Sequence, residues 1–176
     1  MIFNETILKN ACVIDIEKHE DERGFFARSW CRLEFEAHGL NSNLTQCNIS
    51  FNPHKGTLRG LHYQTKPFEE VKLVRCTRGS LCDIIIDLRP DSPTYKKHLR
   101  VTLTAENRRM LYVPENFAHG FLTLEKNTEV FYQISEFYAP ESQRGVRWND
   151  PVLAVAWPRE PKFISQQDRS YPDFCG

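Results

Sequence analysis

Apolar residues along this chain fall into short runs that alternate with polar positions and are separated by turn-forming residues. Runs of this length and spacing predict β-strands rather than helices. The predicted strands cover residues 11–16, 25–30, 44–51, 57–64, 71–76, 81–88, 99–104, 109–113, 120–124 and 128–135. About ten such strands in one chain favour an all-β jelly-roll barrel, because this closure leaves few strand edges exposed.

Besides the strands, the pattern predicts one helix and one long C-terminal loop. Residues 31–40 are the best helix candidate, because apolar residues lie among charged ones and Gly39 provides a stop. Prolines punctuate the second half of the chain, so residues 139–176 are expected to be mostly loop. We expect this loop to wrap over the barrel and to be held by apolar contacts of residues 152–157.

Length and composition add general limits. The chain has 176 residues, which suits a single domain over 1–176 with a sizeable core. Its 23 Lys and Arg residues equal its 23 Asp and Glu residues, so net charge gives no argument for binding nucleic acid or a membrane surface. Residues 1–25 do not resemble a signal peptide and no long apolar run is present, so we expect a cytoplasmic protein. The six cysteines form no CxxC pair, and we expect buried free thiols rather than a zinc site.

The segment 56–64 holds the first candidates for chemistry. Strand alternation places Gly60 and His62 on one face and Arg59 on the other. A bulge at Gly60 would turn Arg59 and His62 toward the same cavity. A histidine in a strand is more often a hydrogen-bonded structural residue, so His62 needs nearby partners before it indicates function.

Lys72, His119 and Tyr132 are further candidates. Lys72 lies between two apolar residues and faces the barrel interior if those residues pack outside, but the opposite orientation fits the pattern equally well. His119 lies at the mouth of the strand predicted over 120–124. Tyr132 shares a strand face with apolar residues, which more commonly indicates a core position.

Two absences in the sequence narrow the chemistry. The chain has neither GxGxxG nor GxxxxGK[ST], so neither a bound dinucleotide nor a phosphate-binding loop is suggested. Metal-binding barrels of this kind typically carry a His-x-His pair with a nearby Glu, whereas His62 is followed by Tyr63 and Gln64. We therefore do not expect a metal site.

Several short motifs occur in a fixed order along the chain. They are DERGFF at 21–26, QCNIS at 46–50, LRGLHYQ at 58–64, DLR at 87–89, SPT at 92–94, AHGF at 118–121, Tyr132, Tyr138 and WNDP at 148–151. Their order and spacing resemble the dTDP-4-dehydrorhamnose 3,5-epimerase family of the cupin superfamily, over nearly the whole chain. The resemblance implies a homodimeric, cupin-type double-stranded jelly roll with short peripheral helices and without metal or diffusible cofactor.

The resemblance also implies a reaction, the inversion of C3, of C5 or of both in a nucleotide-linked 4-keto-6-deoxyhexose, by default dTDP-linked 4-keto-6-deoxyglucose. The C4 carbonyl acidifies the neighbouring C–H bonds, loss of a proton gives an enolate, and reprotonation from the other face inverts the carbon. His62 would be the base, Asp168 would orient it, Lys72 would stabilise the enolate oxygen, and Tyr132 would deliver the proton. Histidine suits proton abstraction because its ordinary pKa of about 6.5 lies near the working pH.

Further residues would contact the substrate. The resemblance implies that Arg59 and His119 contact the diphosphate or the sugar, that Gln46 and Asn48 lie near the diphosphate and the nucleoside, that Tyr138 stacks on the base, and that Arg23 and Phe26 reach the nucleotide from a neighbouring subunit.

Three positions of the substrate-contacting set depart from the family pattern. Arg28 and Gln143 stand where the family has Glu, and Gln167 stands where it usually has Lys. Because Arg only donates hydrogen bonds, Arg28 would suit the acceptors of cytosine, so a CDP-linked 4-keto sugar remains an alternative to the dTDP-linked one. In the simpler alternative, Arg28 points into solvent.

Other classes of protein stay open as alternatives. A non-catalytic sugar-nucleotide-binding cupin would have lost the His62–Asp168 pair or Tyr132, and all three residues are present. Related isomerases that move the carbonyl tend to lack a Tyr at this position, and a metal-dependent isomerase or oxygenase would need a metal ion. The same His and Tyr occur in relatives that invert one carbon or both, so the number of inverted centres is not predicted.

Overall fold

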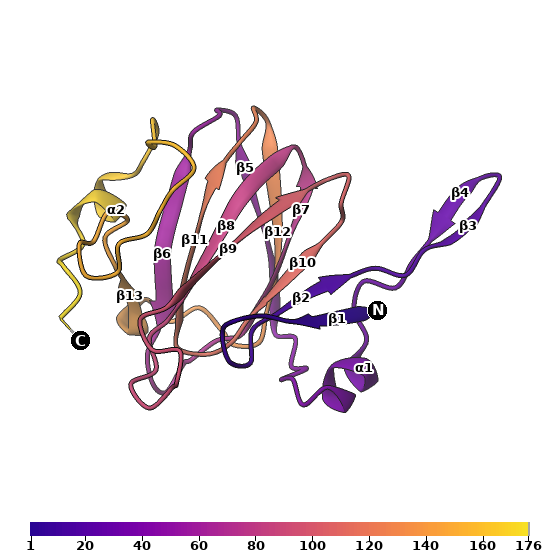
Figure 1. Cartoon of the computed structure of the whole chain (residues 1–176), viewed down its shortest axis with the longest axis horizontal. Helices are drawn as coiled ribbons and strands as arrows, with labels where there is room; N and C mark the ends of the chain where they lie inside the picture. Colours follow the sequence, from indigo (N-terminus) through magenta and orange to yellow (C-terminus); the bar gives the residue numbers. More distant parts are fainter. Residues whose placement is uncertain (176) are drawn as a thin grey trace.

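The computed structural model describes residues 1–175 and consists mainly of two antiparallel β-sheets that face each other (Figure 1). The first sheet has six strands, in the order β1 (Ile2–Glu5), β2 (Cys12–Asp15), β10 (Met110–Val113), β7 (Lys72–Arg78), β12 (Thr128–Ile134) and β5 (Gln46–Asn52). The second has five strands, in the order β13 (Gln143–Gly145), β6 (Leu58–Gln64), β11 (Phe117–Thr123), β8 (Ser80–Asp87) and β9 (His98–Thr104). The prediction of an all-β jelly roll is confirmed.

A two-stranded hairpin and three short helical segments lie outside the two sheets. They are the hairpin of β3 (His19–Asp21) and β4 (Gly24–Phe26), the helices α1 (Arg32–Ala37) and α2 (Gln166–Ser170), and a 3-10 turn (Pro140–Ser142). Figure 1 shows the hairpin extending away from the barrel, while α2 lies beside β6 near the C-terminus. No helix within residues 1–175 is long and apolar enough to cross a membrane.

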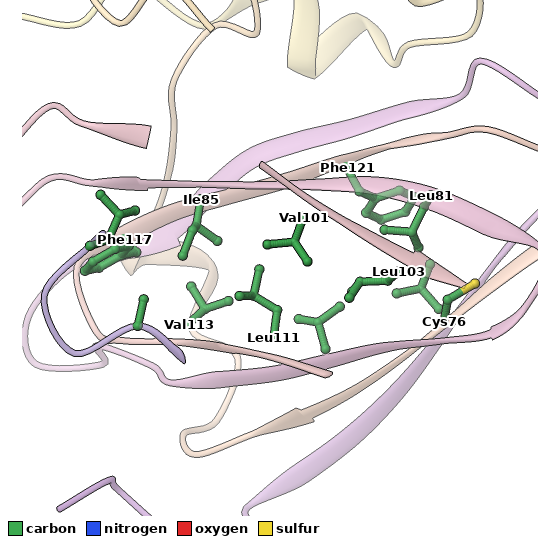
Figure 2. Packing of buried hydrophobic residues seen from close by; sticks show 13 residues of the cluster. Cys76, Leu81, Ile85, Val101, Leu103, Leu111, Val113, Phe117 and Phe121 are labelled. Atoms are coloured by element: carbon green, nitrogen blue, oxygen red, sulfur yellow. The ribbon is translucent and has the colours of Figure 1, made fainter. Parts of the chain in front are cut away.

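The main core lies between the two sheets (Figure 2). Its buried members are Leu8, Ala11, Val74, Cys76, Leu81, Ile85, Val101, Leu103, Leu111, Val113, Phe117, Phe121 and Val130. Strand β8 is buried on both faces, because Leu81 and Ile85 point into this core and Ile84 belongs to a second cluster. That second cluster includes Leu153, so the expected anchoring of the C-terminal loop by residues 152–157 is confirmed. Double-sided burial explains why β8 appears in the sequence as a nearly continuous apolar run.

Strand β6 carries the expected bulge. In the register with β11, His62 lies opposite His119 and Arg59 lies opposite Phe121, so two residues of β6 face one residue of β11 between these pairs. Directly opposed residues of antiparallel strands point to the same face, and the bulge therefore turns Arg59 and His62 to the same side. Only glycine fits at Gly60, because its φ is +114° and a Cβ there would lie 2.5 Å from a backbone Cα of β11.

Several expected strand limits were wrong. The strand expected over 25–30 ends at Phe26, because the following residues leave the hairpin and lead to α1. The strand expected over 120–124 begins at Phe117, so His119 lies within β11 rather than at its mouth. Strands β1, β3 and β13 and helix α2 were not expected, and all four are too short to show a clear period in the sequence.

All six cysteines are free thiols. Cys12, Cys76 and Cys82 are buried as expected, and burial raises the pKa of Cys12 to about 12 and the pKa of each of the other two to about 11. The expectation of burial was wrong for Cys47 and Cys175, which are exposed. Cys47 lies on β5, an edge strand of the six-stranded sheet, where alternate side chains face away from the barrel.

Candidate active site

A cavity of about 820 Å³ lies between the two sheets, and residues 162–169 form part of its wall. This volume is within the range that holds a small-molecule ligand. The sequence-predicted residues that line the cavity are Gln46, Asn48, Arg59, His62, Lys72, His119, Tyr132, Tyr138, Gln143, Gln167 and Asp168. Within residues 1–175, no cluster of three or more His, Cys, Asp or Glu side chains has a geometry that could hold a metal ion.

His62 is paired with a buried carboxylate. Its Nε2 lies 2.6 Å from Oδ1 of Asp168, whose side chain is only 6% exposed while that of His62 is 32% exposed. Asp168 is held at the start of α2, where its backbone N–H donates to the hydroxyl of Ser165 at 3.0 Å. With Asp168 ionised, the proton of the neutral imidazole stays on Nε2, and the lone pair of Nδ1 is free to accept a proton.

Lys72 points into the barrel, which decides between the two orientations that the sequence left open. The residue is 8% exposed and lines the cavity. Its Nζ lies 3.0 Å from Oε1 of Glu70 and donates to the backbone carbonyl of His62 at 3.4 Å. The buried ammonium is a cation fixed in the cavity next to His62, and Glu70 offsets part of the cost of burying it.

Tyr132 reaches the cavity from β12 of the six-stranded sheet, whereas His62 lies on β6 of the five-stranded sheet. Burial raises the pKa of the Tyr132 phenol well above its usual value, and the negative charge of Asp83 adds to this rise, whereas the charge of Arg59 and a hydrogen bond with Ser50 lower it. The net effect is a phenol that keeps its proton at neutral pH and is able to donate it.

Arg59 and His119 also line the cavity. The Nε of Arg59 donates to Oδ1 of Asn52 at 2.8 Å, which leaves the rest of its guanidinium facing the cavity. His119 is buried, and its Nε2 lies 2.6 Å from Oδ1 of Asp83. Its ring and that of Tyr132 are nearly perpendicular, with centroids 6.1 Å apart.

The rim of the cavity is polar. Tyr138 donates its hydroxyl proton to Oε1 of Gln143 at 2.5 Å, and its backbone N–H donates to the side chain of Gln46 at 3.3 Å. Gln167 donates from Nε2 to the hydroxyl of Tyr171 at 3.0 Å. Two of the positions that depart from the family pattern, Gln143 and Gln167, therefore lie at this rim and make uncharged contacts.

Comparison with known proteins identifies the family. The family model described as dTDP-4-dehydrorhamnose 3,5-epimerase matches residues 5–175. A dTDP-4-dehydrorhamnose 3,5-epimerase of Sinorhizobium fredii is 39% identical over 176 residues, covering 99% of this chain and 90% of that protein. The chain belongs to the dTDP-4-dehydrorhamnose 3,5-epimerase family.

Solved structures of dTDP-4-dehydrorhamnose 3,5-epimerases agree with this assignment. The enzyme from Elizabethkingia anophelis has a TM-score of 0.95 at 38% identity, with 99% of this chain and 96% of that chain covered. The enzyme from Bacillus anthracis, described with TDP and PPi bound, has a TM-score of 0.94 at 39% identity, with 98% and 99% covered. The resemblance inferred from the sequence motifs is confirmed.

Three expected site residues of this epimerase lie outside the cavity of their own chain. Arg23 and Phe26 lie on the β3–β4 hairpin, where Arg23 pairs with Asp21 and its side chain is 85% exposed. Arg28 follows the hairpin, and its Nη1 donates to Oε1 of Glu34 at 2.8 Å. A single chain therefore does not bring these residues to its own cavity.

Sequence reasoning missed some polar residues near this epimerase's cavity. Asp83, Glu70 and Ser50 each contact a predicted site residue, and Lys162 and Arg169 line the cavity wall. A weak signal existed for Asp83, because it is a charged residue that interrupts the apolar run of β8. The other four had no local signal, since their positions depend on which segments meet in the fold.

Proposed function

We propose that this epimerase inverts C3 and C5 of a dTDP-linked 4-keto-6-deoxyhexose, with His62 as the base and Tyr132 as the acid. One observation carries the proposal: the two side chains come from opposite sheets and line the same cavity. A sugar ring bound between the sheets would meet the base on one face and the acid on the other. Inversion needs this arrangement, because the proton must return from the side opposite to its removal.

The first step is proton abstraction next to the C4 carbonyl. Nδ1 of His62 takes the proton from C3 or C5, and Asp168 stabilises the imidazolium that forms. The negative charge moves to O4 of the sugar, where Lys72 stabilises it. A fixed donor at such an oxyanion is worth about 3–4 kcal/mol of transition-state stabilisation.

The second step returns a proton to carbon. Tyr132 gives its phenolic proton to the opposite face of the enolate, and the carbon is inverted. Arg59 supports this step, because its charge favours the phenolate that Tyr132 becomes. Proton transfer leaves the oxidation state of the sugar unchanged, so the reaction needs no nicotinamide.

The diphosphate of the substrate needs positive charge at the cavity. Lys72 is balanced by Glu70, and Asp168 is balanced by the His62 imidazolium during the reaction. Lys162 and Arg169 line the cavity and make no ion pair within residues 1–175. We assign them, together with Arg59, to the diphosphate, in place of the family lysine that Gln167 replaces.

A homodimer completes the proposed site. Phe26 on the hairpin is 75% exposed, and Ile49 and Phe51 on the outward face of β5 are 66% and 47% exposed. Exposed apolar side chains on the hairpin and on this strand face would be buried in an interface. With the hairpin laid across a second copy, Arg23, Phe26 and Arg28 would reach the nucleotide in the partner's cavity.

The nucleotide is proposed to be dTDP rather than CDP. The matching family acts on dTDP sugars by its description. The guanidinium of Arg28 already has a partner in Glu34, which weakens the argument that it selects cytosine. Calorimetry with dTDP, UDP and CDP decides the point, and tighter binding of CDP would contradict the proposal.

The proposed reaction is tested by NMR with dTDP-4-keto-6-deoxyglucose and the enzyme in deuterated water. We expect deuterium to enter at C3 and C5 and the product to carry the inverted configuration at both carbons. Exchange at one carbon alone would restrict the reaction to that carbon. No exchange would contradict the proposed function and favour a protein that only binds the sugar nucleotide.

A further inference from the structure

Asp83 is a charged residue at a buried position of the fold. It lies on β8 between Leu81 and Ile85, and the side chains of alternate residues on a strand share a face. Leu81 and Ile85 both belong to the main core cluster between the sheets. In the sheet, Asp83 lies opposite Val101 on one side and Phe121 on the other, and its own exposure is 0%.

The carboxylate of Asp83 is also incompletely satisfied. Oδ1 lies 2.6 Å from Nε2 of His119, but Oδ2 is buried without a hydrogen-bond partner among residues 1–175. A buried carboxylate with one partner destabilises a fold relative to an apolar residue of similar size. Stability therefore does not explain why an acid stands here.

A second buried carboxylate on the same strand shows what a structural role looks like. Asp87 is likewise 0% exposed. It accepts hydrogen bonds from the side chains of Arg89, Ser92 and Thr94. Although burial alone would raise it, these bonds lower the pKa of Asp87 to about 2. Asp87 ties down a loop, whereas Asp83 has a single partner, and that partner lines the active-site cavity.

His119 links Asp83 to both proposed catalytic groups. It lies directly opposite His62 in the β6–β11 register, so the two imidazoles face the same cavity from neighbouring strands. It also packs at nearly a right angle to Tyr132, with ring centroids 6.1 Å apart. Each imidazole is bound through Nε2 to its own buried carboxylate, Asp168 for His62 and Asp83 for His119.

We propose that Asp83 is a positioning residue for the proton-donating side of the reaction. By binding Nε2 of His119, it fixes the orientation of that ring and leaves Nδ1 to face the substrate beside Tyr132. Held in this way, the His119 ring stays in a fixed position beside Tyr132, the group that gives up its proton. The inference rests on the proposed function and assigns a role to a residue that does not itself touch the sugar.

The test compares Asp83→Asn with the parent enzyme in deuterated water, using dTDP-4-keto-6-deoxyglucose. Asn has nearly the same shape and lacks the charge, so it can hold His119 in the wrong tautomer. We expect inversion to slow by at least about tenfold while deuterium exchange at C3 and C5 falls much less, because His62 and Asp168 are untouched. Equal loss of inversion and exchange, or no loss of either, would overturn the inference.

Two further variants separate positioning from folding. Asp87→Asn removes the other buried carboxylate of β8, and we expect a lower melting temperature with an unchanged ratio of inversion to exchange. If Asp83→Asn does not fold, His119→Asn tests the same contact from the other side and should show the same selective loss of inversion. The double variant should lose no more inversion than His119→Asn alone, because Asp83 acts through His119.

The outcomes also separate this inference from the proposed function. A parent enzyme that exchanges no deuterium contradicts the function and the inference together. A parent that exchanges and inverts, beside an Asp83→Asn variant with the parent's ratio, overturns the inference alone.

Discussion

His62 depends on one carboxylate for its orientation, and the contact is short and mostly shielded from water. The 2.6 Å bond to Asp168 fixes which imidazole nitrogen faces the substrate, because the other nitrogen is already engaged. In the proposed reaction, the same carboxylate would stabilise the imidazolium that forms on proton abstraction. The orientation of the proposed base is therefore fixed by a residue 106 positions away in the chain.

Replacing His62 with Asn is expected to lower deuterium exchange at C3 and C5 by about 10²–10⁴-fold, the usual contribution of a general base. Affinity for dTDP, measured by calorimetry, should stay close to that of the parent, because the nucleotide contacts are elsewhere. His38→Asn is a matched control, since His38 follows α1 and does not line the cavity. Exchange at the parent rate in His62→Asn would remove His62 from the role of base.

Replacing Tyr132 with Phe is expected to impair inversion more than deuterium exchange. The phenol is needed for protonation from the opposite face, whereas His62 alone suffices to remove a proton and return a deuteron. Both quantities come from one NMR time course. Tyr112→Phe serves as the control, because the Tyr112 hydroxyl is buried against the backbone of Asn41 outside the cavity. Equal losses of exchange and inversion would exclude Tyr132 as the acid.

Asp87 is expected to govern part of the acid sensitivity. Its pKa is lowered to about 2 in the folded protein, against about 3.9 in an unfolded chain. Its stabilising effect is therefore complete above pH of about 4 and is lost as the pH falls through about 2. Asp87→Asn should lower the free energy of unfolding at pH 7 by on the order of 2 kcal/mol, measured with urea. The exposed Asp91→Asn is the control, and equal stability of both variants at pH 7 would contradict this assignment.

At the scale of single elements, the bulge of β6 decides which side chains face the cavity. It turns Arg59 and His62 to the same side, which a regular strand would not do. The bulge requires glycine, because a Cβ at Gly60 would collide with the neighbouring strand. Active-site geometry is thus built into the pairing of two strands rather than into a flexible loop.

Gly60→Ala is expected to lose both activity and stability. The left-handed backbone alone costs of order 1–3 kcal/mol for a residue with a Cβ, and the contact with β11 adds to it. Gly39→Ala is the matched control, since Gly39 has φ of +68° but nothing within 4 Å of the added carbon. We expect thermal melting to show a clearly larger loss for Gly60→Ala, with epimerisation reduced at temperatures where the variant is folded. Equal melting temperatures for the two variants would contradict the role assigned to Gly60.

The sequence predicted strands correctly where they were long enough for their apolar pattern to be recognised. Strands such as β7, β8 and β12 have seven or eight residues with clear apolar patterns, and each was expected within a few residues. The three-residue strands β3 and β13 carry no such pattern, and they form because other segments lie beside them. The bulge was foreseen because a glycine inside a strand often marks a bulge or a close approach of another backbone.

The sequence predicted the site residues that lie in recognisable motifs, but not the residues that hydrogen-bond to them or pair with them. His62, Lys72 and Tyr132 were expected in the cavity and line it. Asp83 and Glu70 were missed, because an acid becomes a partner only when the fold brings it to a buried histidine or lysine. Such contacts are properties of the tertiary structure, and a strand pattern does not encode them.

At the scale of the whole molecule, the hairpin and the outward face of β5 indicate how two copies would combine. The hairpin extends away from its own barrel (Figure 1), and Phe26 on its second strand is 75% exposed. Laying it on a second copy would cover Phe26 and the exposed side chains of β5 at once. The proposed site would then draw on both chains.

Ile49→Glu is expected to weaken this association. A charge on the outward face of β5 must be desolvated in the interface, so light scattering should detect monomers at concentrations where the parent is dimeric. Affinity for dTDP should fall as well, because the partner's hairpin no longer reaches the cavity and because Ile49 itself borders it. Ile7→Glu is the control, since Ile7 is similarly exposed but lies between β1 and β2. A dimeric Ile49→Glu variant would contradict the assigned interface.

The order of the elements along the chain has a consequence for truncated products. The last strand ends at Gly145, so every strand, including the one that carries His62, precedes Asp168 in the chain. A chain truncated between these two points would retain all the strands of the barrel but lose the carboxylate that binds His62. Loss of the C-terminal segment would therefore separate assembly of the barrel from alignment of the proposed base.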